Sequence, residues 1–179
     1  MSSRLETLLT ESQIQARIRE MANAIDALYA SEANLAGSDV LLIGVLKGSV
    51  HFLSDLARAL KTPTSLDFIQ VSSYLSGKSS TGVVQIRKDL DINIEGRRVL
   101  IVEDIVDTGA TLKHLRELLS TRNPLSIHVA ALLSKPDARK GEVVVEFTGF
   151  EIPNEFVVGY GLDYAERFRN LPYIAILRE

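Results

Sequence analysis

The segment from Val99 to Thr111 constrains the fold of this chain more than any other part of it. It opens with V-L-I-V, an apolar run typical of a parallel strand that is buried on both faces. Glu103 and Asp104 end the run, and Asp107 precedes a stretch of small and hydroxyl residues. Leucines then recur at helical spacing, at positions 112, 115, 118 and 119. The pattern predicts a strand, a short loop and the start of a helix.

The loop before this helix has the composition of an anion site. Small residues at a helix N-terminus leave backbone N–H groups unpaired at the positive end of the helix dipole, which favours a phosphate. Acids beside a phosphate are tolerated where they face hydroxyl groups or a divalent cation. Glu103 and Asp104 therefore indicate a ligand that combines phosphate, hydroxyls and metal, as a sugar phosphate does. A helix cap formed by Asp107 or Thr108 is the simpler alternative, but it leaves the two earlier acids unexplained.

The triplet Asp107-Thr108-Gly109 also occurs at the active site of aspartic proteases. Those enzymes need two such aspartates that share a proton, in an all-β fold. Here the triplet opens a helix after a parallel-type strand, so a protease is disfavoured.

As a block, Val99 to Thr111 closely resembles the phosphoribosyl-pyrophosphate signature of the purine phosphoribosyltransferases, in particular their hypoxanthine-guanine branch. The resemblance implies an α/β type I fold: a central parallel sheet of about five strands, flanked by helices, with a small hood. It implies that Glu103 and Asp104 hold the ribose hydroxyls, directly or through Mg²⁺. Asp107 would be the general base or acid at the purine imidazole nitrogen. The 5-phosphate would be bound by the residues that follow it, Thr108, Gly109, Ala110 and Thr111.

Composition is consistent with a single domain spanning residues 1–179. Hydrophobic residues make up 46% and charged residues 24%, as in ordinary globular proteins. The net charge of −3 and the absence of like-charge blocks argue against nucleic-acid or anionic-membrane partners. The chain has no cysteine, which excludes disulfides and thiolate sites. Its longest clearly apolar run, Val40 to Leu46, is far shorter than the ~18 residues of a membrane span, so we expect a cytoplasmic protein.

A second strand, loop and helix precede the first. Val40 to Val45 reads as a buried strand, Lys47-Gly48-Ser49 as a tight loop, and leucines 53, 56 and 60 as the apolar face of a helix. Gly48 permits close backbone approach to a ligand, and Lys47 adds a positive charge. The G-x-x-x-x-G-K-[ST] spacing of a nucleoside-triphosphatase is absent. By resemblance, Lys47 and Gly48 form the pyrophosphate loop, joined by a cis peptide, and Arg169 also binds pyrophosphate.

The N-terminal region predicts an amphipathic helix without a site. Thr10 and Gln13 have the spacing of a capping box. Apolar residues then recur in steps of four and three, at Ile14, Ile18, Met21, Ile25 and Leu28.

Residues 72–82 are rich in serine and carry little apolar surface, which is typical of a flexible hairpin loop. The resemblance implies instead a lid, headed by Ser73 and Tyr74, that closes over the reacting sugar and excludes water.

Lys135 ends another buried strand, Ile127 to Leu133, and Pro136 stops that strand. Ligands of open parallel sheets bind at the carboxyl edge, where Lys47, Glu103 and Asp107 are also predicted to lie. A lysine at a strand end is more often simply solvated, and this alternative stays open.

The last part, Val143 to Glu179, has short strands and turns that predict a small hood over the sheet edge. The ring of Phe156 either joins the core or stacks on a flat base. Asp163 follows Gly159-Tyr160-Gly161, where the backbone can approach a ligand closely. The resemblance places Lys135, Phe156, the Val157 backbone and Asp163 at the purine site, with Asp163 as a ligand of a second Mg²⁺.

The resemblance thus implies transfer of a phosphoribosyl group from phosphoribosyl pyrophosphate to hypoxanthine and guanine, giving IMP or GMP and pyrophosphate, by a homodimer or homotetramer. A regulatory protein that senses phosphoribosyl pyrophosphate is an alternative, but it would not need Asp107 or the lid. A xanthine-preferring relative is a closer alternative. Lys135, which has only donors, argues against adenine.

Overall fold

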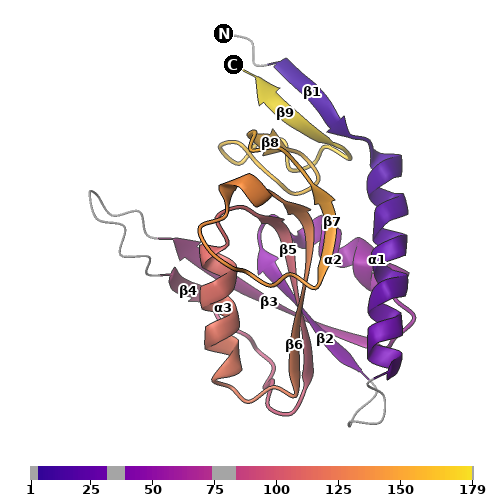
Figure 1. Ribbon diagram of the computed structural model, residues 1–179, viewed down its shortest axis with the longest axis vertical. Helices are drawn as coiled ribbons and strands as arrows, with labels where there is room; N and C mark the ends of the chain where they lie inside the picture. The colour runs from indigo at the N-terminus through magenta and orange to yellow at the C-terminus, as the bar shows by residue number, and fades with distance from the viewer. Residues whose placement is uncertain (1–3, 32–38, 74–83, 179) are drawn as a thin grey trace.

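The computed structural model describes residues 4–31, 39–73 and 84–178 (Figure 1). Its larger sheet has the spatial order β4-β3-β2-β5-β6-β7, in which only β4 runs antiparallel to its neighbour. These strands are β2 (Val40–Leu46), β3 (Thr64–Ser73), β4 (Val84–Lys88), β5 (Arg98–Val106), β6 (Ser126–Ser134) and β7 (Phe147–Glu151). The prediction of an α/β fold around a central parallel sheet is confirmed.

Helices cover both faces of this sheet (Figure 1). Helices α1 (Glu11–Ser31) and α2 (Val50–Ala59) pack on one face, where Ile18 and Phe52 join one apolar cluster with Leu42 and Leu100. Helix α3 (Ala110–Ser120) packs on the other face. Its leucines 112, 115 and 119 contact a second cluster that includes Ile43, Ile101 and Val129. Both faces of the central strands are buried, which explains their continuous apolar sequences.

The N-terminal helix begins as predicted. The Thr10 hydroxyl accepts a hydrogen bond from the Gln13 N–H at 3.3 Å, and the Gln13 side chain accepts one from the Thr10 N–H at 2.8 Å. This reciprocal pair is a capping box. No helix within the described ranges is long and apolar enough to cross a membrane.

A smaller antiparallel sheet lies beyond one end of the larger one, with the order β1-β9-β8 (Figure 1). Its strands are β1 (Arg4–Leu9), β8 (Val157–Val158) and β9 (Ile174–Arg178). Residues 159–173, here called the hood loop, connect β8 to β9. Two details differ from the sequence analysis: strand β1 was not expected, and β7, expected in the hood, extends the larger sheet beside β6. Both strands owe their place to backbone pairing with another strand rather than to a pattern of their own.

Candidate functional site

Three of the predicted site residues follow directly after parallel strands of the larger sheet. Lys47 follows β2, Asp107 follows β5 and Lys135 follows β6. Because β2, β5 and β6 are parallel neighbours, all three residues lie at the carboxyl edge of the sheet. These three residues, which come from separate loops, therefore lie along one edge of the sheet, the edge at which open α/β sheets bind ligands.

Residues 105–112 enclose a cavity at the start of α3. This cavity of 90 Å³ is lined by Ile105, Val106, Asp107, Thr108, Gly109, Thr111 and Leu112. Gly109 has φ of 81°, and a β-carbon there would lie 2.4 Å from Val143, so only glycine fits the turn. The turn brings the first N–H groups of α3 to the cavity. These N–H groups and two threonine hydroxyls suit a phosphate.

Of the two acids of β5, Glu103 is enclosed by protein and Asp104 is partly buried. Glu103 is only 6% exposed, and the strand continues past it to Val106 rather than ending at Val102. Burial, together with the neighbouring Asp104, raises the pKa of Glu103 well above its ordinary value. Burial also raises the pKa of Asp104 to about 6, although the N–H of Ile105 and the charge of Arg169 oppose this shift. Both carboxylates would therefore gain from a nearby cation.

The loop after β2 lies directly against Asp104. A β-carbon on residue 48 would be 1.6 Å from the Asp104 carboxylate, so Gly48 is required there. Gly161 of the hood loop packs closely against the Gly48 carbonyl, because a β-carbon on residue 161 would lie 2.0 Å from that oxygen. The loop does contain a cis peptide, but it joins Leu46 to Lys47, so the expected Lys47–Gly48 position was wrong by one residue.

Lys47 and Arg169, the two cationic residues predicted to bind pyrophosphate, form ion pairs with carboxylates of the hood loop. The ammonium group of Lys47 lies 3.1 Å from Glu166, and the Arg169 guanidinium lies 2.8 Å from Asp163 and 3.4 Å from Glu166. Hydrogen bonds from Lys47 and Arg169 hold the pKa of Glu166 below its ordinary value. Glu166 was missed by the sequence analysis, because an exposed glutamate in a loop carries no signal. The geometry shows a cluster in which the two cations share the carboxylates of Asp163 and Glu166.

Lys135 is buried and directed toward Asp107. Only 7% of Lys135 is exposed, and its ammonium nitrogen lies 3.8 Å from an oxygen of Asp107. Its backbone N–H donates to the Val106 carbonyl at 2.9 Å. The alternative of an ordinary solvated lysine does not agree with this burial.

Phe156 lies at the surface rather than in the core. It is 52% exposed, and its ring meets the ring of Tyr164 edge to face with centroids 5.8 Å apart. Val157 beside it is buried in β8, where it pairs with Ile176. Tyr164, also half exposed, was not predicted as part of the site. The two rings form an exposed aromatic surface suited to a flat ligand.

The structure describes the predicted lid only in part and shows no complete set of metal ligands among the described residues. Ser73 ends β3, and Tyr74, which would head the lid, lies outside the described residues. Among the residues that are described, no group of three or more histidine or acidic side chains has the arrangement of a complete metal site.

Comparison with known proteins adds an independent line of evidence. The model of the phosphoribosyl transferase domain family matches residues 8–165. A relative from Mycobacterium avium, named hypoxanthine-guanine phosphoribosyltransferase, is 58% identical over 170 residues, which cover 95% of this chain and 84% of the relative.

Solved structures with similar names share the fold. The hypoxanthine phosphoribosyltransferase from Staphylococcus aureus has a TM-score of 0.88 and 47% identity, and the match covers 97% of this chain and 91% of that one. The Trypanosoma cruzi enzyme of the same name, solved in complex with the product IMP, has a TM-score of 0.89 and 43% identity, with coverage of 97% and 94%.

Proposed function

This chain belongs to the phosphoribosyl transferase family, and from that premise we propose that it is a purine salvage enzyme. It transfers the 5-phosphoribosyl group of phosphoribosyl pyrophosphate to hypoxanthine, and also to guanine, and releases pyrophosphate. The observation that carries the proposal is the buried Lys135 beside Asp107, directly next to the loop of α3. That arrangement offers a base-recognition donor and a proton-accepting group beside an anion site.

The sugar phosphate is assigned to the carboxyl end of β5. The 5-phosphate accepts hydrogen bonds from the N–H groups and hydroxyls of residues 108–111, at the positive end of the α3 dipole. Glu103 and Asp104 serve the ribose hydroxyls.

We assign the leaving pyrophosphate to Lys47 and to Arg169, a residue of the hood loop. Lys47 and Arg169 bind it in place of Glu166, and the backbone of Gly48 approaches it closely. The transition state of such a transfer is expected to be oxocarbenium-like, with the pyrophosphate largely departed. Stabilising the departing anion is therefore the main electrostatic task of the site.

The purine is assigned to the space between Phe156 and Lys135. Phe156 stacks on the base, Lys135 donates a hydrogen bond to the 6-carbonyl oxygen, and the Val157 backbone contacts the edge of the ring. Asp107 accepts the proton of the imidazole nitrogen as the glycosidic bond forms and returns it in the reverse reaction. Holding base and sugar in line supplies the remaining rate enhancement.

The acidic residues fit a magnesium cofactor. Burial raises the pKa of Glu103 and of Asp104, so a bound cation would favour the charged form of both carboxylates. Mg²⁺ prefers oxygen ligands and takes one or two carboxylates together with substrate phosphates, so a complete protein cage is not required. Glu103 and Asp104 would hold one ion, and Asp163 a second. When bound, the ion neutralises charge between the phosphates and these carboxylates.

Turnover is therefore expected to require a divalent cation. Chelation with excess EDTA should abolish pyrophosphate release, and added Mg²⁺ should restore it. Without a cation, the carboxylates and the polyphosphate would repel each other in the same pocket. Full activity in excess chelator would contradict the roles given to Glu103, Asp104 and Asp163.

The substrate class is tested by measuring pyrophosphate release with four purines. We expect release with hypoxanthine and guanine and none above background with adenine. Faster turnover of xanthine than of hypoxanthine would identify the xanthine-preferring alternative. Binding of phosphoribosyl pyrophosphate without turnover of any base would identify the sensor. Light scattering of the same sample tests the proposed homodimer or homotetramer, and cell fractionation tests the proposed cytoplasmic location.

A further inference from the structure

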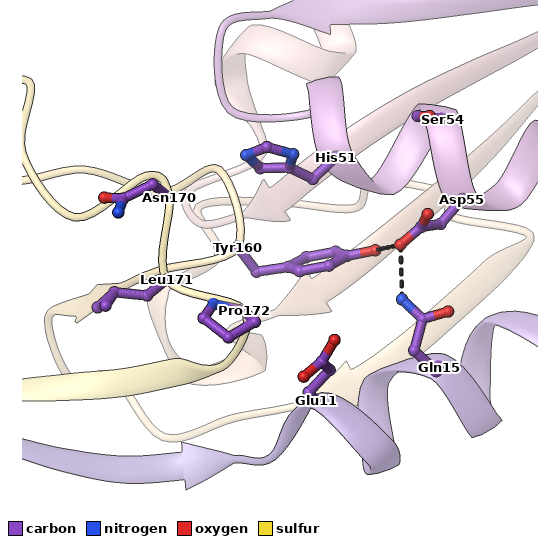
Figure 2. A pocket seen from close by; sticks show the side chains of 9 residues that line it. All are labelled: Glu11, Gln15, His51, Ser54, Asp55, Tyr160, Asn170, Leu171 and Pro172. Carbon is purple, nitrogen blue, oxygen red and sulfur yellow. Dashed lines mark hydrogen bonds between the residues drawn. The ribbon is translucent and has the colours of Figure 1, made fainter.

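A polar cluster outside the substrate site joins the hood loop to two helices. The phenol of Tyr160 donates a hydrogen bond to Asp55 of α2 at 2.5 Å, and Gln15 of α1 donates to the same carboxylate oxygen at 2.6 Å. Figure 2 shows these three side chains converging beside a cavity of 230 Å³. Arg58 donates to the other oxygen of Asp55 at 2.5 Å. The purine and phosphate assignments above use none of these residues.

Burial makes the hydrogen bond from Tyr160 a strong one. Tyr160 is 5% exposed and the Asp55 side chain 15%. Although burial raises the pKa of Asp55, the hydrogen bonds from Tyr160, Gln15 and Arg58 outweigh it and hold the pKa below its ordinary value. Burial and the charge of Asp55 raise the pKa of the Tyr160 phenol. The pair is thus a neutral donor on a carboxylate, a strong hydrogen-bond type in a partly dry environment.

The backbone around Tyr160 adopts a conformation that local sequence does not favour. Gly159, Tyr160 and Gly161 have φ of 99°, 49° and 102°, three left-handed residues in a row. Tyrosine rarely adopts this region, so contacts elsewhere must hold it there. The Tyr160 N–H donates to Leu171 at 2.8 Å, and the side chain is tied to Asp55.

The same turn sets one wall of the pyrophosphate region. Gly161 follows Tyr160 and lies against the carbonyl of Gly48 so closely that no β-carbon fits. The Gly161 carbonyl accepts a hydrogen bond from the Arg169 guanidinium at 2.7 Å, and its N–H donates to the Arg169 carbonyl at 2.9 Å. Helix α2, which carries Asp55, starts two residues after Gly48. Tyr160 and Asp55 therefore connect the two chain segments that meet at Gly48 and Gly161.

We propose that Tyr160 and Asp55 are positioning residues for the pyrophosphate subsite. Their hydrogen bond holds the hood loop against α2, and so sets the separation between the Gly48 loop and Arg169. This inference rests on the proposed function, because it deepens the assignment of Lys47, Gly48 and Arg169 to pyrophosphate. Loss of the bond weakens binding of phosphoribosyl pyrophosphate and of pyrophosphate. Purine binding at Phe156 and Lys135 does not depend on this bond.

The test replaces the phenol without changing the packing. Tyr160→Phe should raise KM for phosphoribosyl pyrophosphate, and the inhibition constant of pyrophosphate, by roughly tenfold, the value of one hydrogen bond to a charged group. KM for hypoxanthine should stay within about twofold, since stacking and the 6-carbonyl contact do not involve Tyr160. Asp55→Asn keeps an acceptor for Tyr160 and should retain more pyrophosphate affinity than Asp55→Ala.

A matched control separates positioning from stability. Tyr29→Phe removes the hydroxyl of another buried tyrosine, which lies within hydrogen-bond distance of His128 at 3.3 Å in the core. It should lower Tm without changing KM for phosphoribosyl pyrophosphate. A wild-type KM in Tyr160→Phe, or an equal rise in Tyr29→Phe, would overturn the inference.

The proposed function is tested separately from this inference. If the wild-type protein transfers no phosphoribosyl group, that function is wrong. Calorimetric titration of wild type and Tyr160→Phe with Mg²⁺-pyrophosphate tests the inference without turnover: equal dissociation constants would overturn it, and a roughly tenfold weaker variant would support it.

Discussion

Replacing Asp107 with asparagine is expected to lower kcat by about 10² to 10⁴, the range of a general acid or base. The carboxylate is half exposed, belongs to a residue that lines the cavity at the start of α3, and is 3.8 Å from the Lys135 ammonium. Asparagine has nearly the same shape but cannot take a proton from the purine imidazole nitrogen. The measurement is single-turnover formation of IMP at saturating hypoxanthine and phosphoribosyl pyrophosphate.

A matched variant shows whether the loss is chemical. Asp89→Asn also removes one half-exposed carboxylate, together with its ion pair to Arg122 at 2.8 Å, but it lies in the loop between β4 and β5. It should keep wild-type kcat, and it should also keep a Tm close to that of wild type, because exposed ion pairs contribute little. If Asp107→Asn turned over normally but melted early, the helix-cap role considered for Asp107 would be correct.

Lys135→Ala is expected to remove most of the discrimination between purines. Wild type should favour hypoxanthine over adenine by roughly 10⁴ in kcat/KM, because a buried donor rejects a base that presents another donor. The variant should lose about 10- to 100-fold with hypoxanthine, the value of a hydrogen bond to a charged group, and should narrow the gap to adenine. Its partner Asp107 is 53% exposed and stays solvated, so the variant should fold.

Phe156→Ala separates base recognition from stacking. Phe156 is 52% exposed, and a ring face cannot distinguish one purine from another, so this variant should weaken hypoxanthine and guanine alike. Lys113→Ala, which removes an exposed lysine of α3, is the control for the loss of charge in Lys135→Ala. It should change neither the ratio of hypoxanthine to adenine nor the ratio of hypoxanthine to guanine in kcat/KM. If Lys135→Ala left the ratio of hypoxanthine to adenine unchanged, Lys135 would have no part in specificity and the substrate class would be open again.

The parts of the fold that were predicted correctly are those written in contiguous residues. The buried runs of β2, β5 and β6, the capping box of Thr10 and Gln13, and the start of α3 after Gly109 all depend on short-range patterns. A buried strand needs an apolar run, and a helix start needs a turn residue and N–H groups without partners. The loop before α3 is local in the same sense, since all the residues lining its cavity lie between Ile105 and Leu112.

The placement of β1 and β7 was not predicted, for a physical reason. Strand β1 mixes leucines with polar residues without clear alternation and pairs with β9 at the opposite end of the chain, as in the partnership of Arg4 with Arg178. Strand β7 reads like any short strand, and only its parallel pairing with β6 places it in the larger sheet. Strand pairing is decided in the assembled sheet, and neither strand carries a periodic signal that identifies its partner.

What the sequence by itself determined is the strand, acid pair and helix-start loop of residues 99–111, together with the order of the βα units that places Lys47 and Lys135 at the same sheet edge. What only the tertiary structure decided is how the hood loop meets that edge: Glu166 beside Lys47, Tyr160 on Asp55, and Gly161 against Gly48. These contacts join residues more than a hundred positions apart, 119 for Lys47 and Glu166 and 105 for Tyr160 and Asp55. Backbone patterns act over one or two turns or a single strand, whereas such contacts exist only once burial of the apolar faces has brought distant segments together.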